Sequence, residues 1–565
     1  FGPLRHVGPG TTRLGVANAY TGETQVLRGT LLIASNGALG GTANGTRVSA
    51  GGTLALGEGV NSSAAEPVFL SGNGATGRSG SLELVDATSA TLASPLTLES
   101  AANASTTFAT AVEGGQLTLT GTVQCTNVSD LNITGPGALE LTGAVHGVRN
   151  LIHRGPGTLR LSNSASTFGS TTSGTANGTL HVGRGTVLVG ADAPHDAPGA
   201  LGRSTNRVRL ATAAYGVSGE EAVLLIDGAY TVARPLQIDA GDRPAAIGNT
   251  GATISRFTGT IFLQRELSVR AAEGGTVRLE GIAQDNTASG SLRIDGPGTV
   301  ELTALNTYTG GTTVVAGTLR LLGQVASPVV VSGGTLAGTG RIASTLTCAA
   351  DGRLAATLPA EPSALDPLRV DGTVTFASGA TLELAGDTAD VGSTWTLVHA
   401  GGFSGPLPRL SLPVGWQGNL AIVDNELRFT LQSTTASSAA AWRLEHFGSS
   451  EVGSVSAALA DPDADGWSNL VEFALGLSPL APDGRDALQV SENSDKLQLT
   501  FMRRAEPTLA YTVEATSTLD TDAWSPIWSS TGIENTDGPV TVTDTVSLTT
   551  NPTRFLRLRV NTTDW

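Results

Sequence analysis

Short runs in which apolar and polar residues alternate recur along the first three quarters of the chain. Three of them, at Gly135–Leu141, Gly155–Leu161 and Gly296–Leu302, begin with Gly-Pro-Gly and a small residue and continue as an apolar-polar-apolar triplet. Proline after glycine sets a turn, and the next glycine permits a positive φ. The alternation that follows is typical of a strand with one buried face. The pattern therefore predicts many short strands joined by tight turns.

A second unit lacks the proline and reads Gly-Thr followed by an alternating run. It begins at Gly29, Gly52, Gly185, Gly275, Gly317 and Gly334. Adjacent copies lie about 20 residues apart, a period that indicates a solenoid. Short strands without helix-length periodicity favour a parallel β-helix over helical repeats, and a β-propeller needs about 40 residues per blade. We therefore expect residues 1–432 to form an all-β solenoid, a parallel β-helix of about 20 coils.

A longer motif gives this solenoid a family resemblance. Asn306–Leu321 reads Asn-Thr-Tyr-Thr-Gly-Gly-Thr and closes on Gly-Thr-Leu-Arg-Leu. Asn18–Leu31 carries another copy, called the first copy below because it comes earlier in the chain, with Asn306–Leu321 as the second. Ser164–Thr172 carries a degraded third. The motif resembles the passenger-associated, or autotransporter-associated, β-strand repeat of secreted bacterial proteins. The resemblance implies a right-handed parallel β-helix on an extracellular or cell-surface protein of a Gram-negative bacterium.

The tryptophans mark a change of architecture. All seven lie at or after residue 395, and a narrow β-helix interior has little room for an indole ring, whereas a compact module can bury one. The run Gln432–Ser438 reads as a linker, helix formers follow at Ala439–Phe447, and alternating runs return after residue 496. We expect a linker and small helical module at 433–486 and an antiparallel β-sandwich at 487–565.

The most specific chemical motif lies in the helical module. Asp461–Glu472 fits D-x-D-x-D-G-x5-E, a loop pattern that binds calcium through oxygen ligands. Gly466 would allow the sharp turn, and a helix would follow at Leu470–Leu477. Ser468 stands where EF-hands usually have an apolar residue that pairs two loops, so the loop resembles a single dockerin-like one. The alternative is an acidic turn without metal. The expected ligands are Asp461, Asp463, Asp465, the carbonyl of Trp467, Asn469 and Glu472.

Composition and charge exclude several function classes. Glycine is about twice as frequent as usual, and charged residues, at 15 %, fall well below the usual ~25 %. The net charge of −16 disfavours nucleic acid and anionic membrane surfaces as partners. The chain has no apolar run of the ~18 residues that a membrane span needs. Cys125 and Cys348 would lie about ten coils apart, too far for a disulfide, so we expect free and mostly buried thiols.

Catalytic patterns are weak. The seven histidines are scattered, and the nearest constellation, Asp192–Asp196 around His195, is better interpreted as a loop between coils. The match to G-x-G-x-x-G at Gly72–Gly77 is expected by chance in a glycine-rich chain without a βαβ context. We therefore expect no enzyme but an extracellular structural protein, a stalk for adhesion, surface coating or filament formation. Its partners would be other copies stacked head to tail, or cell-surface and matrix polymers. The alternative is a polysaccharide-binding or polysaccharide-degrading β-helix.

Overall fold

The computed structural model describes residues 2–63, 66–169, 178–386, 389–413, 416–434, 438–449, 452–482, 486–520, 523–562 and 565. The chain divides into two compact units. The first holds residues 1–389 with 393–411 and 420–430, and the second holds residues 390–392, 412–419 and 431–565. Each unit is described separately below.

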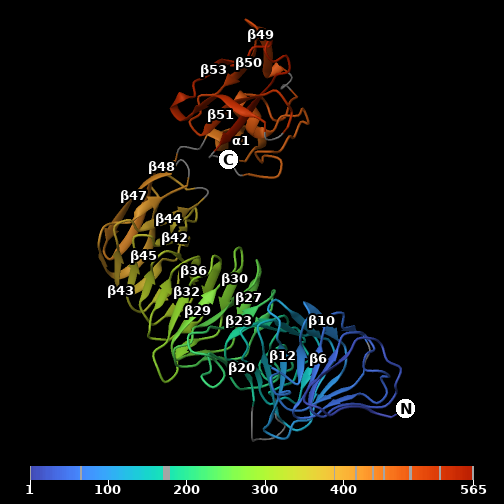
Figure 1. Ribbon diagram of the computed structural model, residues 1–565. Helices are drawn as coiled ribbons and strands as arrows, with labels where there is room; N and C mark the ends of the chain where they lie inside the picture. The colour runs from blue at the N-terminus through green and yellow to red at the C-terminus, as the bar shows by residue number, and fades with distance from the viewer. Residues whose placement is uncertain are drawn as a thin grey trace. The chain divides into compact units, whose positions relative to one another are not determined.

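The first unit is a parallel β-helix, which confirms the fold class predicted from the sequence (Figure 1). Sheet A has seven strands, from β1 (Leu4–His6) to β17 (Val145–His146), and sheet B has twelve, from β2 (Thr11–Leu14) to β31 (Ala283–Asp285). Sheet C runs from β7 (Asn61–Ser62) to β48 (Glu426–Thr434). Sheet D has nine strands, from β24 (Thr231–Val232) to β46 (Arg409–Ser411), and takes the place of sheet A in the order of the coils.

The Gly-Pro-Gly turns stack directly on one another. β16 (Ala138–Leu141) and β19 (Thr158–Leu161) each follow such a turn and pair in parallel, with Leu139 beside Leu159. A Cβ atom on Gly157 would lie 2.0 Å from the carbonyl oxygen of Gly137. Only glycine therefore lets the two turns approach this closely.

Inward-facing residues form continuous apolar columns through the coils. One column on sheet C passes through Leu139, Leu159, Val187, Leu224 and Ile247, all at most 2 % exposed. Each coil buries its apolar residues against its neighbours, so the stability of the rod is close to a sum over these interfaces.

Both cysteines occupy such apolar positions and are free and buried, as predicted. Cys348 in β41 (Leu346–Cys348) lies between Val331 and Phe376 in the column of sheet C. Burial raises the pKa of its thiol to about 11. Cys348 therefore acts as a small hydrophobic residue and is a poor nucleophile at neutral pH.

The coils differ in length, unlike the regular period expected from the sequence. Leu336 pairs with Leu319, 17 residues earlier, whereas Ile226 pairs with Val189, 37 residues earlier. Inserted loops account for the difference. Among the described residues, sheets A and D contribute seven and nine strands to their face.

Trp395 corrects the expectation that an indole ring would not fit the rod. β45 (Thr394–Ser404) belongs to the β-helix, where it pairs in parallel with β43 (Leu368–Phe376) and antiparallel with β48. Trp395 is fully buried, stacks on Phe429 with ring centroids 6.0 Å apart, and donates a hydrogen bond to the Pro359 carbonyl. The antiparallel strand β48 supplies Phe429, on which the ring stacks.

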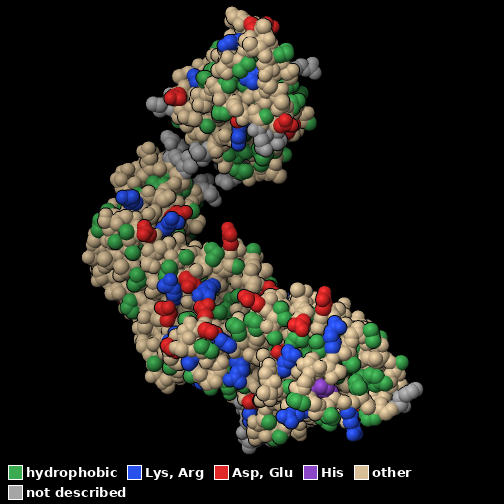
Figure 2. Space-filling view, viewed as in Figure 1, with side chains coloured by type: hydrophobic (Ala, Val, Ile, Leu, Met, Phe, Trp, Pro, Cys, Tyr) green, Lys and Arg blue, Asp and Glu red, His purple; other side chains and the backbone are tan. Residues whose placement is uncertain are grey.

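Outward-facing charges also stack between coils. On sheet D, Glu301 lies in register with Arg278 on one side and Arg320 on the other, with N–O distances of 2.5 and 3.1 Å. Its carboxylate is 5 % exposed, whereas the two arginines are 29 % and 54 % exposed. Figure 2 shows basic and acidic side chains intermingled over this part of the rod.

We expect Glu301→Gln to lower the free energy of unfolding of the rod by about 1–2 kcal/mol, because one buried carboxylate serves two guanidinium groups. The arginines stay hydrated, which limits the loss. Urea denaturation measures it. Glu280→Gln is the matched control, since Glu280 is 34 % exposed and lies 3.5 Å or more from its arginines. Equal effects of the two changes would contradict the prediction.

The second unit has one core formed by helices and sheets together. α1 (Ser438–Phe447) and α2 (Asn469–Leu475) accompany two antiparallel sheets of three strands each. One sheet is β49 (Leu488–Asn493), β50 (Lys496–Arg503) and β53 (Gly538–Thr543), and the other is β52 (Ser525–Thr531), β51 (Leu509–Thr516) and β54 (Phe555–Thr562). None of the described helices has the length and apolar character to cross a membrane.

Aromatic residues hold this core together. Trp442 of α1 contacts Phe473 of α2 and Trp565, with ring centroids 5.7 Å apart in both pairs. The buried hydroxyl of Tyr511 in β51 donates to the Ala474 carbonyl in α2 at 2.8 Å. The segments predicted as a helical module and as a β-sandwich thus share one hydrophobic core.

Candidate calcium loop and repeat corners

The three aspartates of the acidic loop come together in the second unit. One carboxylate oxygen each of Asp461, Asp463 and Asp465 lie within 4.8 Å of one another. Hydrogen bonds from the Asp465, Gly466 and Trp467 amides to these carboxylates wind the chain tightly, at 3.2, 3.0 and 2.9 Å. Gly466 has a φ of +97°, as expected for the sharp turn.

The remaining predicted ligands lie where the loop enters α2. Asn469 and Glu472 are both fully buried, in the first turn of this helix. The Nδ2 atom of Asn469 donates to the Val455 and Ala457 carbonyls at 2.9 and 2.8 Å. Trp467 is half-buried. Within the described chain, the cluster of carboxylate oxygens contains the aspartates but not Glu472.

The aspartates have the chemistry that a calcium ion requires. Calcium prefers carboxylate and carbonyl oxygens on a compact loop. The Oδ2 atom of Asp463 and the Oδ1 atom of Asn469 are buried without a hydrogen-bond partner among the described residues. Burial first, and then the Asp465 and Asp461 carboxylates, raise the pKa of Asp463. A bound cation would relieve this crowding of negative charge, so the loop residues fit calcium.

The repeat motif in the rod forms a corner that connects three coils. Asn306 is fully buried, and its Oδ1 atom accepts the Ala283 amide of the preceding coil at 2.9 Å. Its Nδ2 atom donates to Ala304 and to Gln324 of the following coil, both at 3.1 Å. The hydroxyl groups of Tyr308 and Thr312 hydrogen-bond to each other beside it.

The first copy repeats this geometry. Asn18 Nδ2 donates to the Val16 carbonyl and, at 2.7 Å, to the Ala38 carbonyl of the following coil. The Tyr20 and Thr24 hydroxyl groups are 2.7 Å apart. The sequence predicts the motif but not these hydrogen bonds between coils. Asn, Tyr and Thr at fixed offsets are the signal from which such a network of side-chain hydrogen bonds could be expected. These residues serve the architecture of the coils.

The degraded third copy is described only up to Gly169, and Ser170–Thr172 lie outside the described residues. Phe168 is 1 % exposed and takes the buried place of the tyrosine. The Ser166 hydroxyl accepts the Val145 amide at 3.1 Å. Within its described part this copy therefore keeps the buried ring and a coil-to-coil hydrogen bond.

The loop around His195 serves the fold. Asp192 accepts the Thr231 amide at 2.8 Å, and Asp196 lies 3.6 Å from Arg203. His195 is exposed. The Asp192 carboxylate therefore binds a backbone amide and the Asp196 carboxylate pairs with an arginine, as expected for a loop between coils.

Comparisons with known proteins identify the repeat. The family model of the passenger-associated-transport-repeat matches residues 5–33 and 292–321, which contain the first and second copies of the motif. No curated protein matches the chain. A solved structure, the crystal structure of the Haemophilus influenzae Hap adhesin, is 13 % identical with a TM-score of 0.15, over 74 % of this chain and 64 % of that one. The chain thus carries passenger-associated repeats in two coils of a parallel β-helix.

Proposed function

We propose that this chain is an extracellular, non-enzymatic protein of a Gram-negative bacterial surface, whose β-helix is a stalk for adhesion or surface coating. The passenger-associated repeats within the β-helix carry the proposal, since such repeats belong to exported passenger proteins. In a solenoid each coil contacts its neighbours, and the stacked coils together present an extended surface for binding.

An adherence assay tests the proposal. Fluorescent beads coated with the full chain should be retained on epithelial cell layers or immobilised polysaccharides more strongly than albumin-coated beads. The same polysaccharides are assayed for new reducing ends. Retention without cleavage supports the adhesive stalk. Cleavage, or retention equal to that of albumin, contradicts it.

Head-to-tail stacking is a separate proposal about partners. Exposed strand edges invite pairing with other chains, and a heterologous contact would generate fibres. Sedimentation over a range of concentrations, with negative-stain images, tests it. Filaments that grow with concentration support stacking, and single rods at all concentrations contradict it.

We also propose that the acidic loop binds calcium in a structural role, stabilising the start of α2 and thereby the core of the second unit. Calcium should raise the melting temperature of this unit, because a ligand at about 100 times its Kd stabilises the folded state by about 2.7 kcal/mol. Asp463→Asn should abolish most of this gain. Glu492→Gln, which changes an exposed carboxylate of β49, is the matched control.

Two measurements check this prediction. Thermal unfolding is followed with calcium and with excess chelator, and terbium luminescence is excited through Trp467 in the loop. A calcium-dependent shift and luminescence that Asp463→Asn removes would support the site. An unchanged melting temperature at millimolar calcium, without terbium luminescence, would exclude it.

A further inference from the structure

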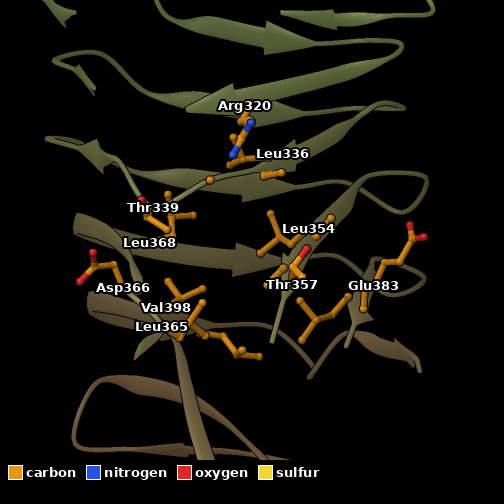
Figure 3. Close-up of a pocket in the computed structure, with 17 residues that line it drawn as sticks. Arg320, Leu336, Thr339, Leu354, Thr357, Leu365, Asp366, Leu368, Glu383 and Val398 are labelled. Carbon is orange, nitrogen blue, oxygen red and sulfur yellow. The ribbon is translucent and has the colours of Figure 1, made fainter. Parts of the chain in front are cut away.

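The last coils of the β-helix surround a cavity of about 370 Å³, lined by Leu336, Leu354 and Leu368 (Figure 3). The Asp366 and Glu383 side chains lie at its opposite ends and point away from it. The leucines fit apolar groups of many kinds, so the cavity does not select one ligand. A more specific chemistry lies in a turn of the first coils, where an asparagine precedes a glycine.

An asparagine that precedes glycine can modify itself. The glycine amide nitrogen attacks the side-chain carbonyl carbon of the asparagine, and glycine has no Cβ atom to hinder the approach. The described residues contain three such pairs, which begin at Asn36, Asn44 and Asn73. Asn177, which begins a fourth pair, lies outside the described residues. The surroundings of the three described pairs differ.

The backbone at Gly37 has the most room to move among the three pairs. Gly37 is exposed, its amide donates to no described residue, and a Cβ atom on it would lie 3.4 Å from its nearest neighbour. A Cβ atom on buried Gly45 would lie 2.6 Å from the Pro67 carbonyl oxygen, and one on half-buried Gly74 would lie 2.3 Å from the Gly80 carbonyl oxygen. The chain is wedged at these two glycines, which hinders the rotation that brings the nitrogen onto the side-chain carbon.

The hydrogen bonds of the Asn36 side chain favour the attack. Its Oδ1 atom accepts the Asn61 amide of the following coil at 2.7 Å, whereas its Nδ2 atom donates to no described residue. The Asn61 amide polarises the side-chain carbonyl and stabilises the negative charge that develops on Oδ1, as a donor of an oxyanion hole does. The exposed position of Asn36 lets water reach the product and lets ammonia leave.

The other two asparagines are less favourably placed. The Nδ2 atom of Asn44 donates to the Thr21 carbonyl at 2.6 Å, which holds the leaving group in place. The Oδ1 atom of Asn73 accepts the Ser105 and Thr107 hydroxyl groups at 2.9 and 2.7 Å, so its carbonyl is polarised as well. Asn73 is therefore slowed by the wedged glycine that follows it.

We propose that Asn36 is a site of spontaneous deamidation and reacts first among the three described pairs. The Gly37 nitrogen bonds to Cγ of Asn36, its proton passes to Nδ2, and the Cγ–Nδ2 bond breaks, so that ammonia leaves and a succinimide ring remains. Water then opens the ring. Addition at Cγ gives aspartate, and addition at the backbone carbonyl gives isoaspartate, whose main chain runs through Cβ and Cγ. One water molecule is consumed for each ammonia released, and nothing is oxidised or reduced.

The two products differ in their effect on the first copy of the repeat corner. The Gly37 carbonyl accepts the Asn18 amide at 3.0 Å, and the Ala38 carbonyl accepts Nδ2 of Asn18 at 2.7 Å. Aspartate keeps the backbone unchanged and retains an oxygen for the Asn61 amide. Isoaspartate lengthens the main chain directly before the two carbonyls, so it weakens their hydrogen bonds to Asn18. This modification is independent of the adhesive role proposed above.

Incubation of the folded full chain in mildly alkaline buffer, followed by peptide mass spectrometry, tests the proposal. Trypsin releases residues 29–47 as one peptide, which carries both Asn36 and Asn44. Asn36 should react about tenfold faster than Asn44 and Asn73, the ratio that a barrier difference of about 1.4 kcal/mol produces. In urea the three rates should become similar, because the fold no longer separates them. The proposal is overturned if Asn36 stays unmodified in the folded chain, or if Asn44 or Asn73 reacts there as fast or faster.

Variants separate the reaction from its consequence. Asn36→Gln keeps a carboxamide but would need a larger ring that closes more slowly, so ammonia release should fall. Asn44→Gln is the matched control and should leave the rate at Asn36 unchanged. Equal ammonia release from the two variants would contradict the assigned site.

Hydrogen exchange of the Asn18 amide reports the effect on the corner. It should be unchanged in freshly prepared Asn36→Asp, which reproduces the aspartate product. In the aged wild-type chain it should become faster in proportion to the isoaspartate fraction of the 29–47 peptide. Equal exchange in the aged chain and in Asn36→Asp would show that isoaspartate leaves the corner intact, against the proposal.

Discussion

Replacing Asn306 by alanine should lower the free energy of unfolding of the rod by about 3 kcal/mol, because each buried polar group left without a partner costs about 1–3 kcal/mol. The side chain joins the Ala283 amide of one coil to the Gln324 carbonyl of the coil two positions on. Alanine leaves the buried Ala283 amide without this acceptor and takes the side-chain donor away from the Gln324 carbonyl. The Ala304 carbonyl keeps a partner, since the Gln324 amide also donates to it at 2.9 Å.

Asn18→Ala is the matched control. Asn18 has the same place in the first copy but is half-buried. Water can therefore replace some of the hydrogen bonds that its side chain makes. Its loss should cost about 1 kcal/mol. Urea denaturation gives the two free energies, and hydrogen exchange of the Ala283 amide reports the local effect. Equal losses, or an Ala283 amide that stays protected in Asn306→Ala, would show that the corner does not couple the coils.

The strands were predictable because each depends on its own few residues. Gly29–Ile33 and Gly185–Val189, chosen for the Gly-Thr unit, are the strands β4 and β21. The helix expected at Ala439–Phe447 is α1 with one more residue at its start. Alternation decides which side chain faces inward, and a glycine turn decides where the strand begins. Both signals are local, so the sequence alone carries them.

The site features depend on neighbours that are distant in the sequence. Trp395 fits the rod because β48 runs antiparallel beside it and Pro359 accepts its indole hydrogen. The acidic loop was predictable down to its three clustered aspartates, whereas the depth at which Glu472 is buried follows from the packing of α2.

Acidification from pH 6.5 to pH 4 should destabilise the rod by about 3 kcal/mol through His153 alone. His153 is 1 % exposed and faces inward in register with Ile133 and Val182. Its Nε2 atom donates to the Gly157 carbonyl at 3.0 Å, and Nδ1 is buried without a partner among the described residues. Burial lowers the pKa of His153 to about 4, and the Arg184 charge acts in the same direction.

The sign follows from the two pKa values. Above pH 6.5 the imidazole is neutral in the folded and unfolded chain, so the histidine does not weaken the fold. Between pH 6.5 and 4 only the unfolded chain takes up the proton, and stability is lost as the pH falls through this window. His181 in the adjacent strand is 8 % exposed, and burial likewise lowers its pKa to about 4, so it adds to the loss.

His153→Leu should remove this part of the acid sensitivity. At pH 7.5 the variant should unfold at nearly the wild-type urea concentration, because leucine suits the apolar column and the Gly157 carbonyl still accepts the Thr186 amide at 3.1 Å. At pH 4.5 it should be more stable than wild type by about 2 kcal/mol. His399→Leu, at an exposed position, is the matched control and should leave the pH dependence unchanged. The prediction is contradicted if the free energies of unfolding of His153→Leu and wild type change in parallel from pH 7.5 to 4.5. The buried imidazole would then take up its proton without destabilising the fold, as it would if a water molecule reached Nδ1.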